Sequence, residues 1–180
     1  YGKKVSVSSS LEGCPAENIV DEDARTAWVA QSNRDTEWVQ IDLQRLSSIH
    51  AIQVNFDEYG ANQKGVVSGV YQSYLIYASA NGEDWSLVVD YGTKKTDTPH
   101  DYIEFEEPFK ARYIKLQNKE YTVSENFSVR NLRIFGKGQG STPRAVNDFT
   151  VERDEADPCK TRLCWEAVPD AQGYIVRYGI

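Results

Sequence analysis

Short runs in which hydrophobic and polar residues alternate recur along this chain, and hydrophobic residues at helical spacing are nearly missing. Alternation with a period of two is typical of a β-strand that buries one face. The pattern therefore predicts an all-β fold, an antiparallel β-sandwich or jelly roll. The strands are expected at Lys4–Ser9, Trp38–Leu43, Ile49–Phe56, Tyr74–Ser79, Ser86–Tyr91, Tyr102–Glu106, Arg112–Gln117 and Val129–Phe135.

Turn residues separate these runs. Ala80–Asp84 contains the pair Asn81-Gly82, which predicts a tight hairpin between its two flanking strands. Pro108 follows Glu107 at the end of another run. Because proline has no backbone N–H to donate to a neighbouring strand, Pro108 is expected to end that strand.

A glycine-rich segment divides the chain, so residues 1–137 are expected to form one domain and residues 138–143 a linker. Residues 144–180 contain three further strand-like runs, at Ala145–Val151, Thr161–Ala167 and Gly173–Tyr178, with the single tryptophan Trp165. These runs resemble the first strands of a fibronectin type III-like β-sandwich. Such a domain needs about seven strands and roughly a hundred residues. The second domain is therefore expected to be incomplete.

Composition excludes several classes of partner. The net charge is −7, from 20 basic and 27 acidic residues, which disfavours nucleic acid and anionic membrane surfaces. The chain has no run of 18 apolar residues, so no membrane span is predicted. Its three cysteines, Cys14, Cys159 and Cys164, are an odd number and predict no disulfide framework, although Cys159 and Cys164 lie close enough in sequence to pair across a turn.

The segment from Asn18 to Leu43 carries a family resemblance. Asp21 precedes Thr26 by five residues, Trp28 follows two residues later, and the alternating run Glu37-Trp-Val-Gln-Ile-Asp-Leu43 comes next. This arrangement resembles the opening of discoidin domains, that is, coagulation factor 5/8 type C domains and family 32 carbohydrate-binding modules. The resemblance implies a galactose-binding-domain-like β-sandwich and a binding role rather than a catalytic one.

The whole chain is similar to the C-terminal accessory region of bacterial family 43 glycoside hydrolases, a discoidin-like module followed by a fibronectin-like one. The similar runs are Tyr74–Trp85, His100–Phe105, Ala111–Leu116, Leu132–Gly136 and Gly173–Gly179. This resemblance implies a secreted protein in the periplasm or at the cell surface. It also implies two partners, a plant-type polysaccharide and the catalytic domain of a parent hydrolase, and no organic cofactor.

Strand order places a candidate binding site. In an antiparallel sandwich every second connection lies at the same end, so four loops are expected to meet: Val29–Glu37, Asp57–Gln72, Gly92–His100 and Asn118–Phe127. Their aromatic rings can stack on a sugar ring, and their polar side chains can bind its hydroxyls. The candidate ligand-binding residues are Asn33, Arg34, Asp35, Tyr59, Asn62, Gln63, Tyr71, His100, Tyr121, Glu125 and Phe127.

Two alternatives remain open for this site. The loops can be ordinary solvated loops, with Tyr121 or Phe127 turned into the core. Galactose-binding relatives often carry a histidine in the first loop, and this chain has none there, so the sugar is left open.

The resemblance also implies a structural Ca²⁺, which takes six to eight oxygen ligands. The matching residues here are Ile19, through its carbonyl, and Asp21, Asp23, Thr26 and Asn131. Asn131 stands where the family usually has a glutamate. The alternative is that Asp21 and Asp23 shape a turn through hydrogen bonds to the backbone.

No catalytic motif stands out. The chain has two histidines, neither His-Glu-x-x-His nor Gly-x-Ser-x-Gly, and no phosphate-binding glycine loop. Four functions are therefore weighed in this order: a carbohydrate-binding module, a structural accessory of a catalytic domain, an adhesion domain, and an independent enzyme.

Overall fold

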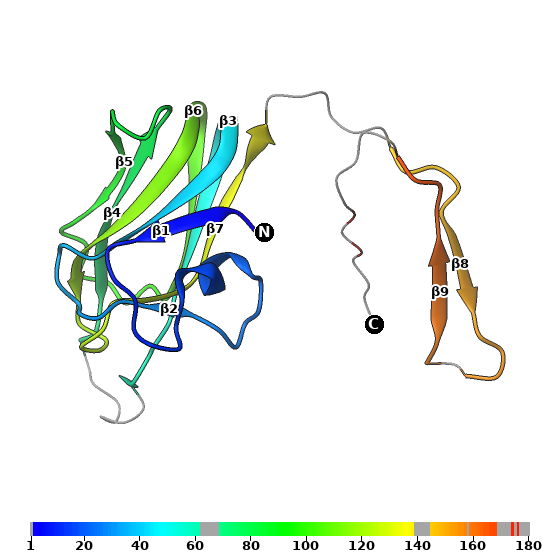
Figure 1. Ribbon diagram of the computed structural model, residues 1–180, viewed down its shortest axis with the longest axis horizontal. Helices are drawn as coiled ribbons and strands as arrows, with labels where there is room; N and C mark the ends of the chain where they lie inside the picture. Colours follow the sequence, from blue (N-terminus) through cyan, green and yellow to red (C-terminus); the bar gives the residue numbers. More distant parts are fainter. Residues whose placement is uncertain are drawn as a thin grey trace. The chain divides into compact units, whose positions relative to one another are not determined.

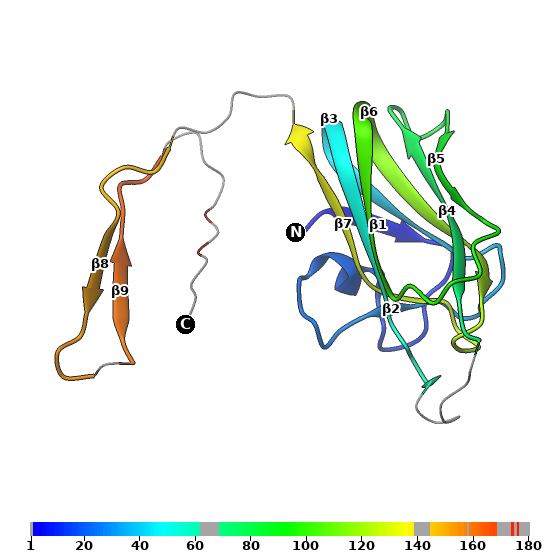
Figure 2. The same ribbon diagram turned by 180° about the vertical axis from the view of Figure 1, so that it is seen from behind.

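The computed structural model describes residues 2–61, 69–138, 145–157, 159–168, 174 and 176 (Figures 1 and 2). The chain divides into two compact units, Tyr1–Gln139 and Gly140–Ile180. The first unit contains β1 (Lys4–Val7), the 3₁₀ helix η1 (Ala16–Val20), β2 (Trp28–Val29), β3 (Trp38–Phe56), β4 (Gln72–Ser79), β5 (Ser86–Tyr91), β6 (His100–Tyr121) and β7 (Ser128–Gly138). The second contains β8 (Thr150–Arg153) and β9 (Thr161–Cys164).

The two long strands β3 and β6 take part in both layers of the first unit. Residues 38–42 of β3 pair with β1 and with residues 113–117 of β6, which pairs in turn with β4, and β4 with β5. Residues 47–56 of β3 pair with β7 and with the earlier part of β6, and β7 pairs with β2. The first layer therefore has the order β1-β3-β6-β4-β5, and the second layer has the order β6-β3-β7-β2. All pairs are antiparallel, which confirms the predicted all-β sandwich.

The prediction of separate short strands was wrong in the middle of the sandwich. Trp38–Leu43 and Ile49–Phe56 belong to one strand, β3, and the two runs on either side of Pro108 belong to one strand, β6. Pro108 does not end its strand. The register between β3 and β6 jumps at this point, so residues 105–108 have no partner on β3 and the missing N–H of proline costs no ladder hydrogen bond.

The predicted hairpin between β4 and β5 is present. Asn81 accepts hydrogen bonds at Oδ1 from the backbone N–H groups of Glu83 and Asp84, at 2.9 Å each. Gly82 has a φ of +86°, a conformation that glycine adopts without strain. The short strand β2 and the helix η1 were not expected from the alternation.

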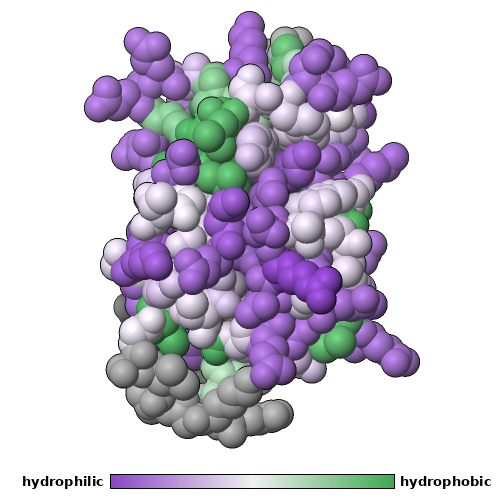
Figure 3. Space-filling model, turned by 90° about the vertical axis from the view of Figure 1, so that its left-hand side faces the viewer, coloured by the Kyte–Doolittle hydropathy of each residue, from purple (hydrophilic) through white to green (hydrophobic). Residues whose placement is uncertain are grey.

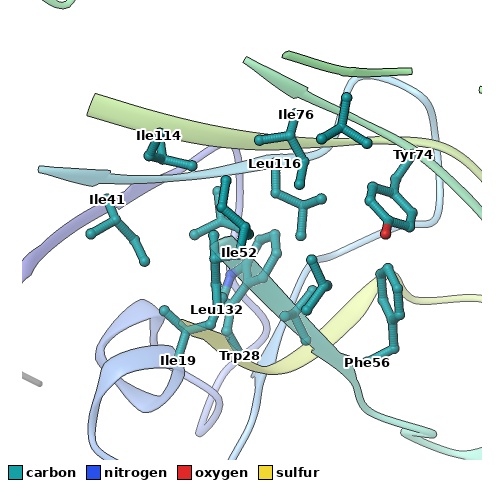
Figure 4. Close-up of a cluster of buried hydrophobic side chains, with 14 of the residues drawn as sticks. Ile19, Trp28, Ile41, Ile52, Phe56, Tyr74, Ile76, Ile114, Leu116 and Leu132 are labelled. Carbon is teal, nitrogen blue, oxygen red and sulfur yellow. The ribbon is translucent and has the colours of Figure 1, made fainter. Parts of the chain in front are cut away.

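The hydrophobic core lies between the two layers, as Figure 4 shows. Alternation along the strands supplies it: Val39 and Ile41 are buried on β3, while Trp38 and Asp42 beside them are not. The largest fully buried side chains are Trp28, Tyr74, Phe127, Ile19, Ile41, Ile49, Ile52, Ile76, Ile114, Leu116, Val29 and Val39. This core fixes both layers and therefore the loops that join them.

In the second unit β8 and β9 form an antiparallel hairpin. The ring of Trp165 lies 6.2 Å from that of Phe149 and 5.2 Å from that of Tyr174, measured between centroids. The four residues of β8 are exposed, and Cys159 and Cys164 are free thiols. A fibronectin type III-like identity for this unit stays a prediction.

Candidate ligand-binding site

The four predicted loops meet at one end of the sandwich. Asn33 in the first loop donates from Nδ2 to the carbonyl oxygens of Tyr121 and Ser124, at 3.1 and 2.9 Å. In return Asn118, at the start of the fourth loop, donates from Nδ2 to the Asn33 carbonyl at 2.6 Å. The second and fourth loops are joined through Tyr71, whose N–H donates to Thr122 Oγ1 at 2.8 Å. Hydrogen bonds from side-chain amides and from the Tyr71 backbone thus hold the first, second and fourth loops against one another.

A buried carboxylate supports the base of the first loop. Glu37 is 6% exposed and accepts hydrogen bonds from the hydroxyl groups of Ser8, Ser9 and Ser32. Burial alone would raise the pKa of Glu37, but these three donors outweigh it and hold the pKa below its ordinary value. Glu37 is therefore ionised at neutral pH and binds the first loop to the segment after β1.

A pocket of about 310 Å³ opens at this end, beside the second and third loops. Its lining residues are Phe56, Asp57, Glu58, Pro99, His100 and Arg130. They come from the end of β3, the start of the second loop, the end of the third loop and β7. The pocket therefore brings together hydrogen-bond donors and acceptors from four separate segments.

Arg130 is the one arginine or lysine among the described residues of this lining, and sequence reasoning missed it. Arg130 Nε donates to Asp57 Oδ1 at 3.1 Å, and Nη2 donates to the same oxygen. The strand register explains its direction, because Asn55 pairs with Asn131 and Phe56 with Val129, so Arg130 is an extra residue in a bulge. A bulge turns a side chain away from the strand alternation. Alternation in the sequence therefore could not have placed Arg130 in the pocket.

Two predicted residues are available to a ligand here. His100 lines the pocket with an exposed side chain, and its Nδ1 lies 3.1 Å from Oδ1 of Asn55. This contact fixes one edge of the imidazole ring. Tyr59, next to Glu58, is 40% exposed. Arg34 is exposed as well, but it lies in the first loop, outside the lining of the pocket.

Tyr121 and Phe127 were wrong as ligand-binding candidates. They are 2% and 0% exposed, and their rings pack against each other with centroids 5.4 Å apart. The Tyr121 hydroxyl donates to the Asp57 carbonyl. Both rings therefore belong to the core, which is the alternative given above for Tyr121 and Phe127. Tyr121 also holds the start of the second loop through Asp57.

The remaining candidates have other roles or lie elsewhere. The Tyr71 hydroxyl donates to Glu120 at 2.5 Å, and Lys95 Nζ lies 5.2 Å from the centroid of the Tyr71 ring. Asp35 is exposed in the first loop and pairs with Lys119 at 3.9 Å. Asn62 and Gln63 lie outside the described residues.

A larger hollow of about 650 Å³ lies in the second unit. Its lining comes entirely from the β8–β9 hairpin and the turn between the two strands. Because its walls are exposed strand residues of an open hairpin, it brings together no distant segments of the kind that meet around the pocket near His100.

Comparison with known proteins decides the family. The sequence model of the F5/8 type C domain matches residues 4–132, which covers the whole first unit except its ends. The chain belongs to the F5/8 type C domain family.

Relatives of this F5/8 type C domain include curated and solved proteins. Lactadherin from Rattus norvegicus is 33% identical over 96 residues, which are 50% of this chain and 21% of lactadherin. The chain thus matches about a fifth of that protein. A chitosan-binding module in complex with chitotriose, from a chitosanase/glucanase of Paenibacillus sp. IK-5, has a TM-score of 0.63 at 20% identity, covering 74% of this chain and 96% of the module. A pectin-binding carbohydrate-binding module has a TM-score of 0.58 at 25% identity, covering 73% and 88%.

No helix in the described part of the chain is long and apolar enough to cross a membrane. The face of the molecule in Figure 3 is mostly hydrophilic, and its hydrophobic side chains gather in a few small patches.

The residues expected to bind calcium in this F5/8 type C domain have their oxygens in use. Asp21 accepts hydrogen bonds from the Asp23 N–H at 2.8 Å and from the Thr26 hydroxyl at 2.7 Å. Hydrogen bonds from Arg25 lower the pKa of Asp23 to about 2, and the Arg25 guanidinium lies 2.7 Å from its carboxylate. The loop therefore has the geometry of a closed turn.

The rest of the expected set is a backbone carbonyl and an amide side chain. The side chain of Ile19 is buried in the core, and Nδ2 of Asn131 is buried without a hydrogen-bond partner. Among the described residues no three His, Cys, Asp or Glu side chains gather to hold a metal ion. The hydrogen bonds of Asp21 and Asp23 match the alternative of a turn closed without a cation, and bound Ca²⁺ stays a prediction.

Calcium is therefore expected to leave the stability of the domain almost unchanged. Adding millimolar Ca²⁺ to the EDTA-treated chain should shift its Tm by less than about 1 °C, because a ligand stabilises a fold only when the folded state binds it. Differential scanning calorimetry measures the shift. Mg²⁺ at the same concentration is the control for ionic strength. A rise of several degrees with Ca²⁺ alone would show that the folded domain binds the cation and would contradict this prediction.

Proposed function

We propose that this F5/8 type C domain is a non-catalytic carbohydrate-binding module whose ligand lies in the pocket beside His100. One observation carries the proposal: Arg130, His100 and Glu58 converge on a hollow of about 310 Å³ at the loop end. Guanidinium N–H groups, imidazole nitrogens and carboxylate oxygens supply the donors and acceptors that sugar hydroxyls need. A concave pocket with a few convergent polar groups is typical of a small-ligand site.

The pocket is arranged to bind without large rearrangement. Asp57 holds the Arg130 guanidinium in place, and Asn55 holds the His100 ring. Side chains that are already fixed lose little conformational entropy when a ligand arrives. Tyr59 follows the lining residue Glu58 in the chain and is 40% exposed, so we expect its ring to be available for stacking on the C–H groups of a pyranose.

The solved relatives support a saccharide as the ligand. One is a chitosan-binding module in complex with chitotriose, and another is a pectin-binding module. Both cover most of the first unit of this chain. We expect the side chains of this pocket, above all Arg130 and Glu58, to determine which sugar binds.

We further infer that the domain serves a secreted bacterial glycoside hydrolase of the family 43 type, in the periplasm or at the cell surface. Its role there would be to keep the catalytic domain near a plant-type polysaccharide, because a second binding site on one chain raises the effective concentration of the first. The second unit, as a fibronectin type III-like segment, would be part of the same accessory region. The chitosanase/glucanase source of one solved relative supports this setting.

Binding to a panel of polysaccharides and their oligosaccharides tests the proposal. Affinity electrophoresis finds the ligand, and titration calorimetry then gives its Kd. His100→Ala and Tyr59→Ala should each weaken binding about tenfold or more, the effect of losing one well-placed contact.

Tyr102→Ala is the matched control for Tyr59→Ala. Tyr102 is also an exposed tyrosine, at 56%, but it does not line the pocket and its ring packs against Phe135, so its loss should leave the Kd unchanged. Equal Kd values for wild type, His100→Ala and Tyr59→Ala would move the site away from the pocket. Binding to no glycan, together with a higher Tm when a catalytic domain is added, would make this a structural accessory.

A further inference from the structure

A row of outward-facing side chains crosses the first layer of the sandwich. The strand registers place Ser6 beside Gln40, Gln40 beside Lys115, Lys115 beside Tyr77, and Tyr77 beside Leu87. We name these five residues the cross-sheet row. With about 4.8 Å between neighbouring strands, the row extends about 19 Å across the layer.

The row faces away from the core. Val39 and Ile41 flank Gln40 in sequence, and both are buried at 0% and 1% exposure. Ile114 and Leu116 flank Lys115 in the same way, with 0% exposure each. Because successive side chains of a strand point to opposite faces, Gln40 and Lys115 lie on the outer face of the layer.

Lys115, at the centre of the row, is surrounded by aromatic rings. Its Nζ lies 3.9 Å from the centroid of the Trp85 ring, 5.8 Å from that of Trp38 and 5.9 Å from that of Tyr77. The three rings come from β3, from β4 and from the end of the β4–β5 hairpin. They are half-buried, so parts of their faces remain open to solvent.

The Lys115 ammonium has no negative partner in the part of the chain that the structure describes. Burial among the rings lowers the pKa of Lys115, because a charge that loses water is disfavoured. Two other cations of this unit are paired with carboxylates: Arg112 with Asp42, and Lys94 with Asp101 at 2.6 Å. Lys115 is thus a partly desolvated charge that a carboxylate would complement.

The neighbours of Lys115 limit what can bring that carboxylate. The rings of Trp38 and Tyr77 offer stacking faces on either side of the amine. Gln40 offers an amide, with no hydrogen-bond partner among the described residues, that can bind hydroxyl groups. One cation pairs with one carboxylate, so rings, an amide and one cation together suit a sugar that carries a carboxylate.

We propose that the cross-sheet row, with Trp38 and Trp85, is a second saccharide site and that it binds uronic-acid oligosaccharides, whose carboxylate pairs with Lys115. This site shares no residue with the pocket beside His100. This second site goes beyond the proposed function, since binding at the row does not depend on binding in the pocket.

Calorimetry with tetragalacturonate and its fully methyl-esterified form tests this site, using the full chain. The two probes have the same rings and hydroxyls and differ in charge. Wild type should bind the acid form about tenfold more tightly than the ester, as expected for one charge-assisted contact. Lys115→Met should bind the acid form about tenfold more weakly than wild type and leave the ester unchanged. Lys115→Arg, which keeps the charge, should retain most of the preference.

The variants separate this site from the pocket. His100→Ala should not change the affinity for tetragalacturonate. Equal affinity of wild type for acid and ester, or unchanged affinity of a folded Lys115→Met for the acid, would overturn the row. Loss of binding of the acid form in His100→Ala would also contradict the second site, and it would support the pocket beside His100. Binding of tetragalacturonate that depends on Lys115, without binding of neutral glycans, would support the row and count against the pocket. Lys115→Gln provides a second neutral variant if Lys115→Met does not fold.

Discussion

Trp28→Ala should lower the free energy of unfolding of this domain by about 3–5 kcal/mol, the range seen when a large buried aromatic side chain is truncated. Trp28 is 0% exposed and lies where β2 meets the core. Its ring packs edge-on against Phe127, with centroids 5.7 Å apart. Its indole N–H lies 3.0 Å from the Ser9 carbonyl and 3.1 Å from the Ser10 hydroxyl. The substitution therefore removes core volume and the bonds that hold the segment after β1.

Urea unfolding followed by far-UV circular dichroism measures this loss without depending on tryptophan fluorescence. The Tm should fall by about 10 °C as well, from the usual ratio of free energy to temperature shift for a protein of this size. Trp28→Phe is the matched control, because it keeps an aromatic ring and loses the indole N–H, so its loss should be clearly smaller. A loss below about 1 kcal/mol for Trp28→Ala would contradict the placement of Trp28 in the core.

Alternation in the sequence predicted the layers of the sandwich because burial of one face is a local property of each strand. It could not predict that β3 and β6 run on through both layers. That continuity depends on the register jumps between Asp42 and Ser47 and between Ile49 and Ala51, where the paired strands skip residues. A skipped residue is set by the partner strand, so it has no signature in the strand's own sequence.

Skipped residues in the strand register also explain which site predictions were correct and which were wrong. The meeting of the four loops follows from antiparallel strand order alone. The direction of the Tyr121 side chain does not follow from strand order. Tyr74 pairs with Asn118 but Ser73 pairs with Glu120, so one residue of β6 between them has no partner on β4. The skip reverses which side chains face the core, and Tyr121 turns inward. The bulge at Arg130 has the opposite effect, because it turns a side chain outward into the pocket. The alternation of the sequence does not indicate this direction.

Glu37→Gln should destabilise the domain by about 1.5–3 kcal/mol at pH 7, the range for hydrogen bonds to a charged group. The wild-type carboxylate accepts from Ser8, Ser9 and Ser32 inside the fold. The glutamine keeps the size of the side chain but has a single, neutral acceptor oxygen. Glu12→Gln, at an exposed glutamate, is the matched control for the change of one charge.

The pH dependence of this difference identifies the charge as its cause. The pKa of Glu37 is lowered in the folded state from its ordinary value of 4.5, so the carboxylate stabilises the fold at every pH above that value. As the pH falls below 4.5 and through the lowered pKa, the folded state takes up the proton and this stabilisation is lost. Urea unfolding at a series of pH values should therefore show wild type and Glu37→Gln converging in acid, while wild type and Glu12→Gln stay close throughout. A difference that persists unchanged at the lowest pH would show that Glu37 acts through its shape and not through its charge.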